Sequence, residues 1–112
     1  MRIAIPVANG NLSLHFGHCE KFTIVDVDEE AKTILNIEEF DAPPHQPDML
    51  PRWLGEKKVN VVIVSGIGYR AQSLFEQQNI AVLTGAPPVS PESLVSHYLN
   101  GTLVAGANVC DH

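Results

Sequence analysis

The segment from Val59 to Leu83 constrains the fold more than any other part of the sequence. It begins with VNVVIV, a short and almost wholly apolar run, continues through YRAQSLFEQQN, and ends in a second apolar run, IAVL. Short continuous apolar runs are typical of parallel strands that are buried on both faces. The intervening segment has apolar residues at helical spacing. A strand, a helix and a parallel strand in succession form a right-handed crossover, so the chain is predicted to be an α/β protein.

Three more strands are predicted before this crossover. RIAIPV, from Arg2 to Val7, forms the first, and KFTIVDVD and TILNIEEF form an antiparallel hairpin around the turn EEAK. The segment NGNLSLHFGHCE, between the first strand and the hairpin, is predicted to be a loop. These strands and the two of the crossover are predicted to form one five-stranded mixed sheet.

Helices are predicted on either side of the crossover and within it. MLPRWLGEKK has Met49, Leu50, Trp53 and Leu54 on one helical face, and Asp48 is its expected N-cap. In SPESLVSHYLNG, the expected N-cap is Ser90, the first helical residue Pro91, and the residue after the C-cap Gly101.

The size and charge of the chain limit its class. A length of 112 residues predicts one domain, residues 1–112. With 13 acidic and 7 basic residues, the net charge is −6, and no basic block could follow a phosphate backbone, so nucleic acid is not an expected partner. No apolar run could span a bilayer, and no signal peptide is recognised, so we expect a cytoplasmic protein without membrane contact.

Three loops are expected at one edge of the sheet. Carboxyl ends of parallel strands lie together, and ligands bind there where the strand order switches. The loops are Ala8–Cys19, Ser65–Tyr69 and Thr84–Val89.

The first loop contains a dense group of metal-ligating residues. Within SLHFGHCEKF lie His15, His18 and Cys19, and imidazole and thiolate suit zinc, copper and iron–sulfur centres. The alternative is a loop that Phe16 and Phe22 anchor, with solvated polar residues between them. Two cysteines cannot provide a Cys₄ site in one chain, so a mixed site, a site shared between chains, or a cluster with its own sulfides remains.

The second loop has the form of an anion site. Gly66 and Gly68 frame the turn before the second helix, and the N–H groups of Ile67 to Tyr69 are predicted to face the crevice. The turn is neither a dinucleotide fingerprint nor a Walker loop. The alternative is a tight turn with no ligand.

The C-terminal segment TLVAGANVCDH adds two more candidate ligands. Cys110 and His112 would point the same way in an extended tail, and they are predicted to fold back toward Cys19. The alternatives are a frayed terminus and a Cys19–Cys110 disulfide, which a reducing compartment disfavours.

The sequence resembles the dinitrogenase iron–molybdenum cofactor biosynthesis family in four short motifs and in their order. The motifs are SLHFGHCEKF, GIGYRA, the GA after the fifth strand, and YLNGTLVAGANVCDH. This family contains NifX-like proteins and the C-terminal domain of NifB-like proteins. The resemblance covers almost the whole chain. It implies a ribonuclease-H-like fold with strand order 3-2-1-4-5 and an antiparallel strand 2.

The resemblance also implies binding of an iron–sulfur or molybdenum-containing cluster, or of its precursor. Some relatives outside nitrogenase systems hold a molybdenum–copper sulfide cluster. The chain lacks a radical-SAM cysteine motif, so a carrier, not an enzyme, is predicted. Its expected partners are the cluster and a donor or acceptor protein, with the chain a monomer or weak homodimer.

Two alternatives to the carrier remain at this point. One is a metal-free regulatory or interaction domain of the same fold. The other is a hydrolase that uses Cys19 and a histidine, for which no nucleophile elbow or orienting partner is recognisable. A nuclease would need a carboxylate cluster, and the first strand supplies no acid.

Overall fold

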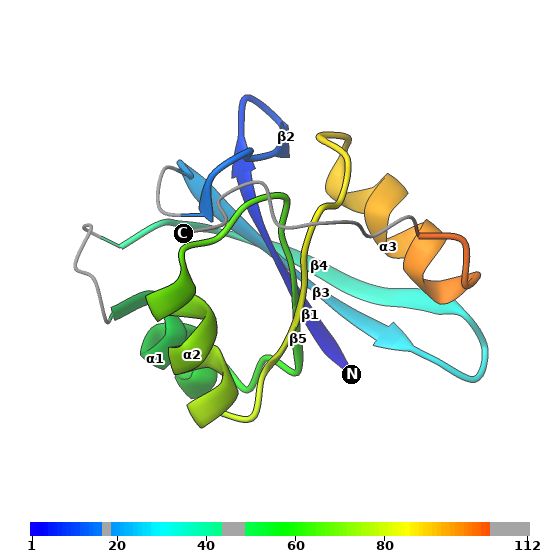
Figure 1. Ribbon diagram of the computed structural model, residues 1–112. Coiled ribbons are helices and arrows are strands. Elements are labelled where there is room, and N and C mark those ends of the chain that lie inside the picture. The colour runs from blue at the N-terminus through cyan, green and yellow to red at the C-terminus, as the bar shows by residue number, and fades with distance from the viewer. Residues whose placement is uncertain (17–18, 44–48, 104–112) are drawn as a thin grey trace.

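The chain folds into a mixed β-sheet with helices on both of its faces (Figure 1). The computed structural model describes residues 1–16, 19–43 and 49–103. In chain order, the strands and helices are β1 (Arg2–Ala8), β2 (Asn11–Leu12), β3 (Lys21–Asp28), β4 (Thr33–Asp41), α1 (Met49–Glu56), β5 (Val61–Ile63), α2 (Tyr69–Gln77), β6 (Ala81–Leu83) and α3 (Pro91–Leu99).

The order of the main strands agrees with the predicted order. The sheet runs β4-β3-β1-β5-β6, which is the predicted 3-2-1-4-5. The strand predicted to be antiparallel is β3, and it is antiparallel to both of its neighbours, β1 and β4. β5 is parallel to β1 and to β6, so the predicted crossover through α2 is confirmed.

The predicted number of strands, five, is wrong, because the sheet already has six strands in the described parts of the chain. The additional strand is β2, which pairs antiparallel with the end of β1. Between these strands, Asn9 and Gly10 both have positive φ, 55° and 81°. A two-residue type I′ hairpin turn requires such angles, and Asn-Gly is strongly preferred in it. The segment predicted as a loop from Ala8 to Cys19 therefore begins with a short hairpin.

Each face of the sheet has its own apolar core. On one face, α1 and α2 cover a core that includes Phe22, Val62 and Phe75. On the other face, α3 covers a core that includes Ile3 and Ile5. Figure 1 shows α1 and α2 together on one side of the sheet and α3 on the other. Successive side chains of a strand point to opposite faces, so the central strands contribute to both cores.

The ends of α3 are formed by the residues predicted for them. The hydroxyl of Ser90 accepts a hydrogen bond from the backbone N–H of Ser93 at 3.3 Å, and Pro91 is the first helical residue. Gly101 follows the C-cap with φ of 71°, a value that glycine adopts at low cost. The predicted cap Asp48 lies outside the described residues. No helix in the described parts of the chain is both long and apolar enough to cross a membrane.

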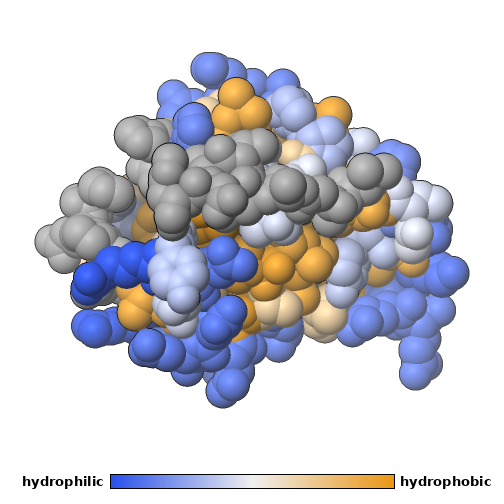
Figure 2. Space-filling model, viewed as in Figure 1, coloured by the Kyte–Doolittle hydropathy of each residue, from blue (hydrophilic) through white to orange (hydrophobic). Residues whose placement is uncertain are grey.

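The two edge strands differ in character. In β6, Val82 and Leu83 are half-buried, and Figure 2 shows apolar surface in the middle of the face on which β6 lies. In β4, every residue except Phe40 is exposed. The carboxyl half of β4 also carries Glu38, Glu39 and Asp41. One edge strand is therefore apolar, whereas the other exposes Ile34 and Leu35 in its amino half and acids in its carboxyl half.

Phe16 fastens the first loop to the core below it. Its side chain is only 4% exposed, and its ring centre lies 5.8 Å from that of Phe22 and 5.3 Å from that of Phe75, with edge-on geometry. Edge-on pairs of this kind stabilise a fold beyond the area that they bury. Phe16 and Phe22 therefore do anchor the loop, as the alternative to a metal site also assumed, and these contacts do not decide between the two.

We expect Phe16→Ala to lower the free energy of unfolding by about 3–5 kcal/mol, because it leaves a cavity at the centre of this aromatic cluster. Leu14→Ala is the matched control in the same loop. Its side chain is 53% exposed, so the change should stay within about 0.5 kcal/mol. Urea denaturation of both variants measures the difference. Equal losses in the two would show that Phe16 does not anchor the loop.

Candidate functional site

The three predicted loops meet at one edge of the sheet, along the upper side of the view in Figure 1. Backbone hydrogen bonds join them. The N–H of Leu12 donates to the carbonyl of Val89 at 2.9 Å, and the N–H of Gly85 donates to the carbonyl of Ser65 at 2.9 Å. The edge on which the sequence placed the site is therefore a single connected surface, formed by segments distant in sequence.

The closest link is between the first and second loops. His15 and Gly66 form a parallel β-bridge, and the N–H of Phe16 donates to the carbonyl of Gly66 at 2.9 Å. The hydroxyl of Ser13, a buried residue, donates to the carbonyl of His15 at 2.9 Å. These bonds hold the backbone of His15 beside the glycine turn. His15 is nevertheless exposed to solvent.

Cys19 lies at the other end of the first loop. It is half-buried, packs against the core beneath α1 and α2, and carries a free thiol. Cys110, the other residue of the disulfide considered above, lies outside the described residues. Burial raises the pKa of the Cys19 thiol from 9.0 to about 11. The thiol is neutral at physiological pH, whereas the thiolate is the form that attacks electrophiles and binds metals.

The glycine turn, residues 66–69, is buried in its first half and exposed to solvent in its second half. Gly66 and Ile67 are buried, whereas Gly68 is exposed and Tyr69 is 72% exposed. Gly68 is the N-cap of α2 in an extended conformation, with φ of −69° and ψ of 150°. An extended backbone does not require glycine, and a Cβ added at Gly68 would meet no atom within 4 Å. Its lack of a side chain thus leaves open surface next to the start of α2.

The structure describes only part of the predicted ligand set. His15 and Cys19 are described, but His18, Cys110 and His112 lie outside the described residues. Among residues 1–16, 19–43 and 49–103, no three side chains of His, Cys, Asp or Glu are placed to hold a metal ion. The described part of the site thus contains two of the predicted soft donors, and the metal site as a whole stays a prediction.

A depression next to His15 was not predicted from the sequence. It has a volume of about 350 Å³ and is lined by the β1–β2 hairpin, by Ser13 to His15 and by Pro88. The Asn-Gly dipeptide at residues 9–10 is the signal that could have revealed it, because the hairpin forms one wall. The lining contains asparagine and serine side chains but no carboxylate, although the protein is acidic overall.

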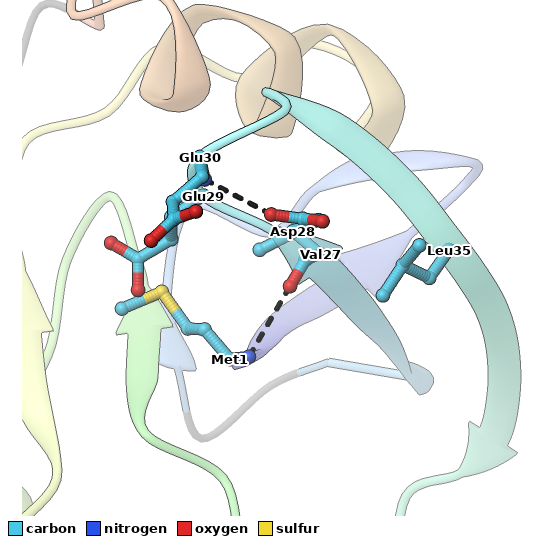
Figure 3. Close-up of a pocket in the computed structure, with 6 residues that line it drawn as sticks. All are labelled: Met1, Val27, Asp28, Glu29, Glu30 and Leu35. Atoms are coloured by element: carbon cyan, nitrogen blue, oxygen red, sulfur yellow. Dashed lines mark hydrogen bonds between the residues drawn. The ribbon is translucent and has the colours of Figure 1, made fainter.

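A second depression lies at the opposite end of the sheet (Figure 3) and has a volume of about 510 Å³. Its lining includes Asp28, Glu29 and Glu30, which lie at the turn between β3 and β4. The carboxylate of Asp28 accepts hydrogen bonds from the N–H groups of Glu30 and Ala31, at 3.0 and 3.1 Å. This depression is far from the loops described above, and the three acids that line it are not placed to hold a metal ion together.

Comparison with known proteins agrees with this arrangement. Residues 1–101 match the model of the family described as dinitrogenase iron-molybdenum cofactor. An uncharacterized protein of Methanocaldococcus jannaschii is 33% identical over 106 residues, which cover 92% of this chain and 89% of that protein. The chain therefore belongs to the dinitrogenase iron-molybdenum cofactor family.

Solved structures share the fold. The crystal structure of the protein PH0822 is 29% identical and superimposes with a TM-score of 0.86 over 94% of each chain. The apo form of the orange protein from Desulfovibrio gigas is 20% identical, with a TM-score of 0.73 over 96% of this chain and 93% of that chain. The second likeness concerns the fold alone.

The raised pKa of Cys19 predicts slow alkylation in the metal-free protein. At about pH 8, iodoacetamide should modify Cys19 roughly 100-fold more slowly than a thiol of ordinary pKa, because two pKa units reduce the thiolate fraction by that factor. The rate should keep rising with pH toward about 11. Mass spectrometry of the peptide that contains Cys19 measures the rate, and denatured protein is the control. A plateau near pH 9 would contradict the prediction.

Proposed function

We propose that the protein binds and carries a metal–sulfur cluster, iron–sulfur or molybdenum-containing, or the precursor of one. The cluster is its cargo, and the protein acts in cofactor assembly or storage without catalysing a reaction. Family membership over residues 1–101 supports the connection with the cofactor. We place the protein in the cytoplasm, with a cluster donor or acceptor protein as its partner.

The observation that carries this proposal is the β-bridge between His15 and Gly66. The bridge joins the loop that contains the soft donors His15 and Cys19 to the glycine turn. The exposed end of this turn, Gly68, is the N-cap of α2. A thiometallate cargo is anionic and has soft metal ions. Imidazole and thiolate suit the metal ions, and a helix N-terminus favours the negative charge.

The described donors fit such a cargo as a partial set. Two soft donors cannot complete a tetrahedral metal site, but a cluster that brings its own sulfides needs fewer protein ligands. We propose that His18 adds a third donor and that Cys110 and His112 complete or cover the site. Since the Cys19 thiol is neutral at physiological pH, loading must release its proton. The ribonuclease-H-like class of the fold is likewise a proposal.

Enzyme alternatives have less support. A nuclease of this fold would need clustered carboxylates, but Asp26 is bound to Arg2 at 2.8 Å and Asp28 serves the turn. A cysteine hydrolase needs an activated thiolate, whereas burial raises the pKa of Cys19. A metal-free interaction domain is the remaining alternative, and metal loading separates it from the carrier.

Anaerobic loading of the untagged protein tests the proposal. Ferrous iron with sulfide, and separately tetrathiomolybdate, should give charge-transfer bands and bound metal. Cys19→Ser and His15→Ala should each weaken binding by about 10–100-fold, as loss of groups that hold or orient a metal commonly does. His97→Ala is the matched control, because His97 is exposed on α3 and contacts Thr102. A protein that takes up no metal would favour the interaction domain.

The exposed end of the glycine turn gives a second test. Gly68→Val should leave the Tm within a few degrees of the parent, because the backbone there is extended and the added Cβ meets no atom. Binding of tetrathiomolybdate should nevertheless weaken, because the new side chain crowds the surface in front of α2. Calorimetric titration and thermal unfolding measure the two effects. Unchanged binding in a folded variant would show that the turn is structural only.

A further inference from the structure

Within the part of the chain that the structure describes, alternate residues of the edge strand β4 have backbone groups without a strand partner. The N–H of Ala42 donates to the carbonyl of Glu20 at 3.0 Å. Hydrogen-bonded pairs alternate along an antiparallel ladder, so Phe40, Glu38 and Asn36 direct their N–H and C=O groups toward β3. The corresponding groups of Ile37, Glu39 and Asp41 point to the outer edge. Pairing of Met1 with Val27 at the β1 side of β3 agrees with this assignment.

The side chains of β4 do not shield these groups. Glu38, Glu39 and Asp41 are exposed, and Ile37 is 41% exposed. β4 has nine residues, whereas native proteins often keep edge strands very short, because a long open edge is a template for pairing with another strand. In the described parts of the chain, no strand pairs with the outer side of β4.

The charges on β4 select the kind of strand that can pair there. The strand contains three acids and no base. Its only ion pair among the described residues is a long one, 3.9 Å between Glu39 and Lys21, with both side chains exposed. Two copies of β4 side by side would bring six acids together, and among the described residues only Glu39 of each copy has an ion-pair partner. Like charges across a strand pair are destabilising. A basic strand would instead place its cations opposite these acids.

The acidic carboxyl half of β4 lies at the same edge of the sheet as the candidate site. β4 is antiparallel to β3, which is antiparallel to β1, so the carboxyl ends of β4 and β1 lie at the same edge. Lys21 pairs with Asp41 on one side and with Val7 on the other. The hydrogen bond between Ala42 and Glu20 is one residue from Cys19. A strand added to β4 would lie about 5 Å further out, with one end at this same edge of the sheet.

We propose that β4 is the docking edge for a partner protein, which adds an extended basic segment to the sheet through the outward groups of Ile37, Glu39 and Asp41. Backbone pairing supplies the affinity, and Glu38, Glu39 and Asp41 supply the preference for lysine or arginine. An added strand buries a small area, so the complex is transient, with a Kd of roughly 10 μM to 1 mM. The inference concerns docking and holds for any cargo of the loops.

The test uses the metal-free protein and a synthetic peptide of roughly seven residues in which lysine and valine alternate. With bound peptide, amide exchange of Ile37, Glu39 and Asp41 should slow by about tenfold or more, because these amides gain a partner. The amides of Asn36, Glu38 and Phe40 should not change. The same peptide, N-methylated at its central amides, keeps its charge and should not bind.

Two consecutive glutamate pairs provide matched variants. Glu38→Gln with Glu39→Gln should weaken peptide binding by about threefold to tenfold. Glu29→Gln with Glu30→Gln, the same charge change in the hairpin turn, should not. Ile37→Pro removes an outward N–H without breaking the ladder to β3 and should also weaken binding.

Several outcomes would overturn the proposal. They are equal weakening by both glutamate pairs, binding of the N-methylated peptide, and no alternation in the slowed amides. Slowing of the same amides that rises with protein concentration in the absence of peptide would identify a second copy as the occupant, which also contradicts a basic partner. None of these outcomes depends on metal binding, so failure here leaves the cluster proposal to its own test.

Discussion

The parallel pairing of β1 with β5 is the contact on which the rest of the structure depends. It joins Ile3 to Val61 and Ala4 to Val62, and all four side chains are buried. Because the two strands run in the same direction, the segments that follow them leave the sheet at one edge. The first loop and the glycine turn can therefore meet, and the bridge between His15 and Gly66 extends the same pairing beyond the strands. Without this pairing the candidate ligands would have no common surface.

Much of the fold could be predicted from the sequence because its signals are local or strongly apolar. The VNVVIV run identifies the buried parallel strand β5, and the IAVL run identifies the parallel strand β6. Ser90, Pro91 and Gly101 mark the ends of α3. The strand order came from the family resemblance, not from residue patterns. The strand β2, which was not predicted, has only two residues, too few to show any periodicity. Its only sequence signal is the Asn9-Gly10 dipeptide of the turn that precedes it.

The position of the three loops was predictable, but the chemistry of their side chains was not. Topology places the loops, and topology follows from the strand pattern. The state of Cys19 depends instead on how much water its side chain loses against the core, and burial there raises its pKa to about 11. No spacing rule reports such burial. Similarly, the open surface at Gly68 depends on what lies around a missing Cβ. The predicted roles of His18, Cys110 and His112 fall outside the described residues and stay predictions.

The separation of β1 and β5 in the sequence has a consequence for the order of folding. The β3–β4 hairpin is closed by a short turn, so it needs little loop-closure entropy, whereas pairing β1 with β5 must first close a loop that contains that hairpin and α1. Contacts between distant segments form slowly. The surface that joins His15 to Gly66 therefore cannot exist until that slow step is complete. A nascent or partly unfolded chain can possess its acidic edge strand while still lacking the place where cargo would be held.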